Sequence, residues 1–248
     1  MNPMEQFAVK PIFHIPVGHY DLAFTNQSLW MCIVVGFASL FMLAAVASPK
    51  LVPGRLQSMG ELTYEFVAGM LRSAAGEDGV RFFPFVFTIF VFVLFSNFFG
   101  LIPGAFTVTS QIAVTFALAS LVILTVIITG FAVHGIGFLK LFVPDAPFLL
   151  LLLLVPIEVI SFFTRPISLS VRLFANMLAG HTMLKVFAGF VIALGSAGGV
   201  WFAVSVAPMA LIIAITALEM LVAFLQAYVF AILTCIYLNE ALHLHDHH

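Results

Sequence analysis

Long stretches of this chain carry almost no charge, and that feature most constrains its fold. Residues 28–47, 82–102 and 111–133 are apolar over about the 20 residues that a helix needs to cross a ~30 Å hydrocarbon core. Across the chain 63% of residues are hydrophobic and only 8% are charged. A soluble fold is excluded, because too few polar groups remain to cover its surface. The sequence predicts an all-α polytopic membrane protein forming one membrane domain.

The last two apolar stretches, residues 146–192 and 200–240, are too long to stand upright in a bilayer. As continuous helices they would be about 70 and 60 Å long. Either each stretch breaks into two spans, with Pro156 and Pro166 as breakers in the first, or each forms one strongly tilted helix.

The other segments are more polar. Residues 1–27 are predicted to form an extramembrane arm, and residues 55–75 an amphipathic helix on a membrane surface or against a partner. Basic loop residues fall on one side of a chain with about five membrane segments, and only Lys10 falls on the other. The positive-inside rule then predicts an outside N-terminus and a cytoplasmic C-terminus. The loop residues are Lys50, Arg55, Arg72, Arg81 and Lys140.

Several functions are disfavoured. The net charge of −2 provides no basic surface for nucleic acid. Cys32 and Cys235 lie inside apolar runs without ligand spacing, and the His-rich residues 243–248 suggest a flexible end, to which we assign no function. No phosphate loop, metal motif or nucleophile elbow occurs, so we expect no metal, no cofactor and no catalytic site of the chain's own.

Charged residues inside the apolar stretches are costly and usually mark ion paths. Arg172 lies too far from both ends of its stretch to reach water by snorkelling. It either forms an internal ion pair that fixes helix packing, or it is a permanent cation that faces an exchangeable anion. The other charged residues in these stretches are Glu158, Arg165, Lys185 and Glu219.

Helical spacing relates these residues to one another. Asn176 is one turn after Arg172, and Arg165 and Glu158 are one and two heptads before it. Glu158 marks a second aqueous cavity or simply pairs with Arg165. His181 would lie opposite Arg172 on a straight helix, so its partner must come from another helix, where Glu219 and Gln226 share a stripe. A buried His beside a carboxylate would form a proton relay, or a pair that serves packing alone.

The string PISLSVRLFANMLAGH, residues 166–181, resembles the signature of subunit a of the membrane (Fo) sector of F-type ATP synthase. The placing of Glu158, Glu219 and Gln226 and the ending AYVFAILTCIYLNEA resemble the same family. The His181 and Glu219 pair is similar to the arrangement in mitochondrial and related alphaproteobacterial members. The resemblance implies long, strongly tilted final helices, and two offset half-channels for protons. It assigns Arg172 to face carboxylates of the c-subunit ring, Asn176, His181, Glu219 and Gln226 to the outside half-channel, and Glu158 and, more weakly, Ser168 to the cytoplasmic one.

The same resemblance implies partners and a location. Expected partners are the c ring, the membrane helices of peripheral-stalk subunit b and, indirectly, the F1 sector, in the inner membrane of a bacterium. Proton flow would then drive ring rotation and ATP synthesis. The alternatives are a stand-alone proton-coupled secondary transporter, disfavoured because the chain has no internal repeat, and an intramembrane scaffold.

Overall fold

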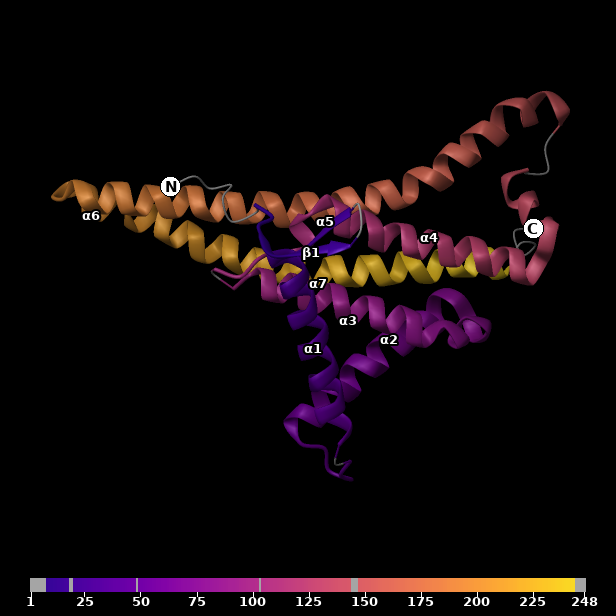
Figure 1. Ribbon diagram of the computed structural model, residues 1–248, viewed down its shortest axis with the longest axis horizontal. Helices are drawn as coiled ribbons and strands as arrows, with labels where there is room; N and C mark the ends of the chain where they lie inside the picture. Colours follow the sequence, from indigo (N-terminus) through magenta and orange to yellow (C-terminus); the bar gives the residue numbers. More distant parts are fainter. Residues whose placement is uncertain (1–7, 18–19, 48, 103, 144–146, 244–248) are drawn as a thin grey trace. The chain divides into compact units, whose positions relative to one another are not determined.

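The computed structural model describes residues 8–17, 20–47, 49–102, 104–143 and 147–243, most of them helical. By length and composition, five helical segments in this part of the chain could cross a membrane, which confirms the predicted fold class. Figure 1 shows the elements β1 Pro11–Val17, β2 Tyr20–Thr25, α1 Asn26–Val46, α2 Arg55–Gly79, α3 Phe83–Gly100, α4 Ile112–His134, α5 Phe148–Ala197, α6 Val200–Val204 and α7 Val206–Leu242.

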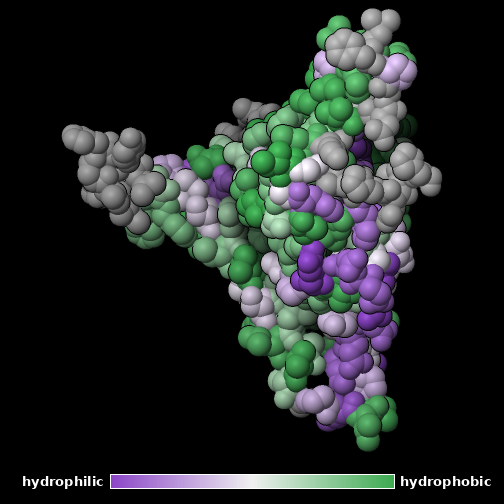
Figure 2. All heavy atoms as spheres, turned by 90° about the vertical axis from the view of Figure 1, so that its right-hand side faces the viewer, coloured by the Kyte–Doolittle hydropathy of each residue, from purple (hydrophilic) through white to green (hydrophobic). Residues whose placement is uncertain are grey.

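The surface carries many large hydrophobic side chains, as expected where lipid is the solvent. Leu152 on α5 is 80% exposed and Ile192 on the same helix is 68% exposed. Figure 2 shows hydrophobic residues, in green, over much of the visible face. Helices suit this environment because each satisfies its own backbone hydrogen bonds.

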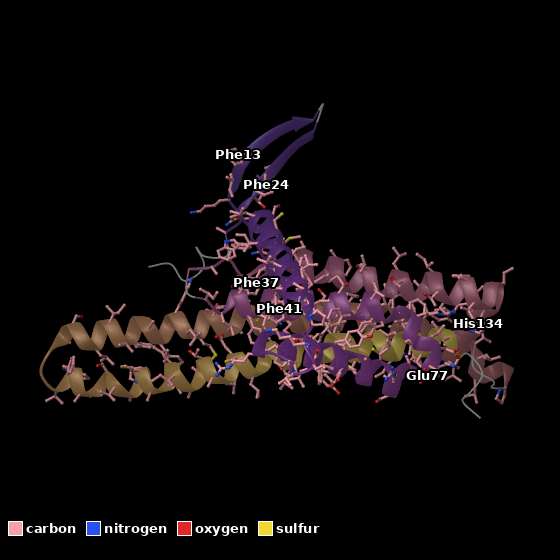
Figure 3. The ribbon with its side chains drawn as sticks, turned by 90° about the horizontal axis from the view of Figure 1, so that it is seen from below. Phe13, Phe24, Phe37, Phe41, Glu77 and His134 are labelled. Atoms are coloured by element: carbon pink, nitrogen blue, oxygen red, sulfur yellow. The ribbon has the colours of Figure 1, made fainter. Side chains whose placement is uncertain are left out.

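The described part of the N-terminal arm forms an antiparallel hairpin, which the sequence did not predict. Phe13 of β1 is paired with Phe24 of β2, and both are labelled in Figure 3. Asn26 fixes the hairpin to the start of α1, because its Oδ1 accepts from the Lys10 backbone N–H at 3.1 Å and its Nδ2 donates to the Ala8 carbonyl at 3.1 Å.

The first long apolar stretch is one helix. Helix α5 runs through both Pro156 and Pro166 without interruption. Of the two alternatives for this stretch, the broken pair of spans is therefore wrong. The second long stretch is divided at Ser205 into the short α6 and the long α7.

The chain forms two compact units, and several helices contribute residues to both. Unit 1 comprises the described residues of Met1–Ser39, Phe92–Gln111 and Leu173–Ala227. Unit 2 comprises those of Leu40–Val91, Ile112–Arg172 and Tyr228–His248. Fully buried apolar side chains form the core of each, with Val34, Val93 and Leu173 in unit 1 and Leu71, Phe90, Leu169, Phe230 and Leu238 in unit 2. The C-terminal residues 244–248, which hold most of the His-rich tail, lie outside the described residues.

Candidate functional site

In unit 1, Glu219 of α7 lies against Gly180 of α5, the residue that precedes His181. His181 is 7% exposed and Glu219 is 9% exposed. The Glu219 carboxylate lies directly against the backbone of Gly180, so closely that a Cβ atom added at Gly180 would collide with Oε1. Only a glycine leaves this space, and so the AGH segment of α5 both provides the histidine and receives the carboxylate from α7.

The amide side chains of Asn176 and Gln226 link the same two helices. Asn176 Nδ2 on α5 donates to Gln226 Oε1 on α7 at 3.3 Å. Gln226 is two turns after Glu219 along α7, so the two share a face of that helix, as the sequence predicted. The four residues assigned to the outside half-channel therefore all lie in unit 1, on α5 and α7.

A buried asparagine that sequence reasoning passed over joins this group. Asn97 on α3 donates from Nδ2 to the Ala223 carbonyl of α7 at 3.1 Å, and its Oδ1 accepts from Thr109 Oγ1 at 2.9 Å. Asn97 and Thr109 are fully buried. The only sequence signal was a polar Ser96–Asn97 interruption in an apolar run, and it did not indicate a partner on α7.

Three buried polar atoms of unit 1 have no hydrogen-bond partner within the described residues. They are Ser96 Oγ, Glu219 Oε2 and Gln226 Nε2. An unsatisfied buried group costs about 1–3 kcal/mol, so such groups are rare where they serve packing alone. Two of the three, on Glu219 and Gln226, belong to residues that share one face of α7.

In unit 2, Arg165 of α5 pairs with Glu240 of α7. The Arg165 Nη1 group donates to Glu240 Oε2, and the side chains are 24% and 28% exposed. The guanidinium carbon lies 5.3 Å from the centre of the Tyr237 ring, close enough for a cation–π contact. The suggestion that Glu158 pairs with Arg165 is wrong, and within the described chain the half-buried Glu158 forms no ion pair.

The hydroxyl residues of this part of α5 differ in their surroundings. Ser168, the weaker candidate for the cytoplasmic path, is exposed. Ser170 is the buried one, and its hydroxyl is hydrogen-bonded to Thr115 of α4 at 3.0 Å.

At the other end of α4, His134, labelled in Figure 3, donates from Nε2 to the Leu242 carbonyl at 3.0 Å and so fixes the end of α7.

Arg172 has a different environment from Arg165. Its side chain is exposed, as are those of the apolar neighbours Ile167 and Val171. No carboxylate in the described part of the chain pairs with it. The described residues therefore do not form the internal ion pair that was one of the two alternatives for Arg172. The structure instead leaves a permanent cation on an exposed helix surface, with Ser168 and Asn176 one turn to either side of it.

The metal-ligating residue types do not gather. Within the described ranges no group of three or more His, Cys, Asp or Glu side chains could hold a metal ion. The two cysteines are both free, with Cys235 buried and Cys32 exposed.

Comparison with known proteins gives concordant matches along the chain. A family model described as ATP synthase A chain matches residues 28–239. A curated relative named ATP synthase subunit a, from Mesorhizobium japonicum, is 60% identical over 244 residues, 98% of this chain and 97% of the relative. Proteins of the same name from a Chelativorans species and from Parvibaculum lavamentivorans are 60% and 56% identical, each over 98% of this chain and over 98% and 94% of their own lengths.

Proposed function

This chain belongs to the ATP synthase A chain family, and from that premise we propose how its polar residues move protons. The predicted family is confirmed, since the family model covers most of the chain and full-length relatives share more than half of its residues. The chain is a proton-translocating membrane subunit, and it assembles with other subunits into the complete synthase. The route of the protons, the roles of single residues and the direct partners are the proposal.

The observation that carries the proposal is the exposed, unpaired Arg172. An arginine at mid-membrane costs roughly 2.5–3.5 kcal/mol on insertion scales, and this one has no carboxylate partner in the described part of its own chain. Because a guanidinium stays charged even when desolvated, it requires an anion from elsewhere. We assign that anion to the carboxylates of a rotating ring of c subunits, each of which passes Arg172 in turn.

The outside half-channel consists, in this proposal, of Asn176, His181, Glu219 and Gln226. Support comes from the burial of His181 and Glu219 and from the unsatisfied Oε2 of Glu219. A proton that arrives from outside is taken up by this pair and passed to an ionised ring carboxylate. The neutral carboxyl group can then enter lipid at far lower cost than the anion.

The cytoplasmic half-channel involves Glu158 and, less strongly, Ser168. Glu158 is half-buried and forms no ion pair within the described residues, so its carboxylate is available to accept a proton. Both residues belong to unit 2, whereas the residues of the outside path belong to unit 1. The exposed position of Ser168 supports its role less well than the position of Glu158 does.

Arg172 separates the two paths electrostatically. Its charge attracts a ring carboxylate in the ionised form, favours release of that carboxyl's proton to the cytoplasmic side, and repels protons that would leak directly. Each proton that crosses releases about 2.3 kcal/mol per 100 mV of membrane potential. Rotation of the ring carries this energy to the F1 sector, and the chain itself has no catalytic site.

We further propose the inner membrane of a bacterium as the location, with the N-terminus outside and the C-terminus in the cytoplasm. The basic loop residues support this orientation. Besides the c ring, the membrane helices of peripheral-stalk subunit b would hold the chain stationary while the ring turns.

The test is Arg172→Ala in inverted membrane vesicles, with complex assembly, ATP-driven proton pumping and passive proton leak measured together. We expect an assembled complex that does not pump, and a leak that is unchanged or larger. Arg55→Ala, which removes an exposed arginine at the start of α2, is the control and should pump normally. Normal coupled pumping by the Arg172→Ala complex would refute the proposal and favour a scaffold role.

The secondary-transporter alternative makes a separate demand. Such a transporter would move protons or an anionic substrate when the chain alone is reconstituted into vesicles. We expect no substrate-coupled proton uptake under those conditions, because the anion that faces Arg172 belongs to another subunit.

A further inference from the structure

A cavity between α2 and the start of α3 is separate from the residues assigned above. Its volume is about 330 Å³, and two arginines line it, Arg72 on α2 and Arg81 just before α3. Its other walls include the ring of Tyr64, the ring of Phe83 and the side chain of Leu71. All of these residues belong to unit 2.

The chain forms this cavity by turning at Gly76. Arg72 and Arg81 are nine residues apart and would lie on opposite faces of an uninterrupted helix. Gly76 has φ 65° and ψ −166°, a conformation that side-chain-bearing residues rarely adopt, and it interrupts α2 there. The chain then returns along α2, so that the rings of Tyr64 and Phe83 are 4.6 Å apart. The turn brings the two guanidinium groups to one cavity.

Neither arginine is neutralised within the described residues. The ion pairs formed there are Arg165–Glu240 and His243–Asp78. Arg81 has its guanidinium carbon 5.0 Å from the centre of the Phe82 ring, which orients the group without cancelling its charge. Two permanent cations thus face a cavity whose remaining walls are largely aromatic and aliphatic.

We propose that this cavity binds the phosphodiester group of an anionic phospholipid. Guanidinium groups match phosphate oxygens with paired hydrogen bonds. Tyr64 and Phe83 provide an apolar surface for an acyl chain, which a free phosphate ion would not use. A zwitterionic lipid is disfavoured, because its ammonium group would be repelled by the second arginine. The inference rests on the membrane location of the chain and does not depend on the proposed proton path.

The helix that carries Arg72 is itself suited to lie at a lipid surface. Leu56, Met59 and Leu62 of α2 are exposed, with Leu62 at 64%, while Glu61 and Glu65 are exposed on the same helix. An amphipathic helix with this pattern lies at the boundary between headgroups and acyl chains. Basic cavities at that depth are where anionic headgroups bind.

The experiment uses the intact complex, with the full-length chain, in phosphatidylcholine vesicles that contain a photoactivatable phosphatidylglycerol probe. Labelling of residues 64–84 is measured by mass spectrometry. The variants are Arg72→Gln/Arg81→Gln and the charge-retaining Arg72→Lys/Arg81→Lys. Arg55→Gln, which removes a charge from the same helix outside the cavity, is the matched control. Parallel samples use a phosphatidylcholine probe, or add inorganic phosphate as competitor.

We expect each lost arginine to lower labelling about fivefold, so about 25-fold for the Gln/Gln variant. The Arg55→Gln control should stay within about twofold of the unchanged chain, because it loses no charge at the cavity. The Lys/Lys variant keeps both charges but not the paired guanidinium–phosphate hydrogen bonds, so its labelling should lie between that of the unchanged chain and that of the Gln/Gln variant. Equal labelling of the Gln/Gln variant, or equal labelling by the phosphatidylcholine probe, would overturn the proposal. Displacement by inorganic phosphate would reassign the cavity to a free anion. Because Lys/Lys keeps both charges, labelling as low as that of the Gln/Gln variant would also overturn the proposal.

Discussion

The substitution Gly180→Ala is expected to move the Glu219 carboxylate while leaving the packing of α5 unchanged. A Cβ atom at this position would collide with Glu219 Oε1 and lie 2.9 Å from Cδ and 3.2 Å from Cγ. Contacts below about 3 Å are not tolerated by close-packed interiors, so the carboxylate must move. The backbone of α5 need not, because the colliding atoms are the end of a flexible side chain.

The size of the effect follows from two opposing terms. Alanine in a helix is favoured over glycine by about 0.5–1 kcal/mol, and forcing a side chain off its rotamer costs about 0.5–1.5 kcal/mol. The net change in the free energy of unfolding is therefore expected to stay within about 1 kcal/mol. Displacing a reacting group by about 1 Å, by contrast, can cost about 100-fold in rate. We expect ATP-driven proton pumping to fall about 10- to 100-fold in a complex that still assembles.

The assay measures pumping and complex content in the same vesicles. Gly189→Ala, on the same helix, is the matched control, because a Cβ atom there meets no atom within 4 Å. It should pump normally and be slightly more stable. Glu219→Asp shortens the side chain by one methylene and so withdraws the carboxylate from position 180. Adding Gly180→Ala to Glu219→Asp should therefore lower pumping less than Gly180→Ala lowers it in the unchanged chain. Unchanged pumping by Gly180→Ala would refute the close packing of this carboxylate on the glycine.

Two further changes test contacts that hold the helices together, both measured as thermal unfolding of the full-length chain in detergent. Arg165→Leu leaves Glu240 unpaired in a half-exposed position and should destabilise by about 1–2 kcal/mol; the exchanged pair Arg165→Glu/Glu240→Arg should recover most of this, and no recovery would argue against a direct ion pair. Thr109→Val removes the hydrogen bond to Asn97 and should cost about 1 kcal/mol. Thr125→Val, at an exposed helix position, should cost less, and equal effects would contradict a structural role for Thr109.

The fold class was predictable because lipid allows so few solutions. A chain with 8% charged residues and long apolar runs must satisfy its backbone internally, which in a membrane means helices. The hairpin of β1 and β2 had no comparable signal. Its strands are short and contain Pro11 and Pro16, residues that ordinarily weaken a strand assignment.

The ion-pair partner of Arg165 could not be predicted from residue spacing within one helix. Glu158 is seven residues away and on nearly the same stripe, so the sequence suggested it as a partner. Seven residues of helix, however, separate two Cα atoms by about 10 Å along the axis, too far for a direct ion pair in most rotamers. Glu240 is 75 residues away in sequence and lies opposite in space. Pairing between helices depends on their packing, which periodicity within one helix does not report.

Gly180 and Asn97 illustrate a second limit. A glycine inside a helix can be replaced by alanine without strain, and only the approach of Glu219 from another helix makes Gly180 special. Small residues at membrane helix contacts are the general signal that could have indicated it. Asn97 stood out as a polar residue in an apolar run, but its partner is a backbone carbonyl, and every residue of α7 has one.

The contrast between Arg165 and Arg172 connects the fold to the proposed mechanism. Two arginines seven residues apart on one helix have the same charge, yet one is paired with Glu240 and the other faces outward without a carboxylate. An arginine held like Arg165 would first have to give up its pair with Glu240, at a cost of about 1–2 kcal/mol, before it could bind a passing carboxylate. An arginine that serves a rotating ring must bind each carboxylate transiently. The chain meets that requirement by pairing the structural arginine internally and leaving Arg172 to a partner that moves.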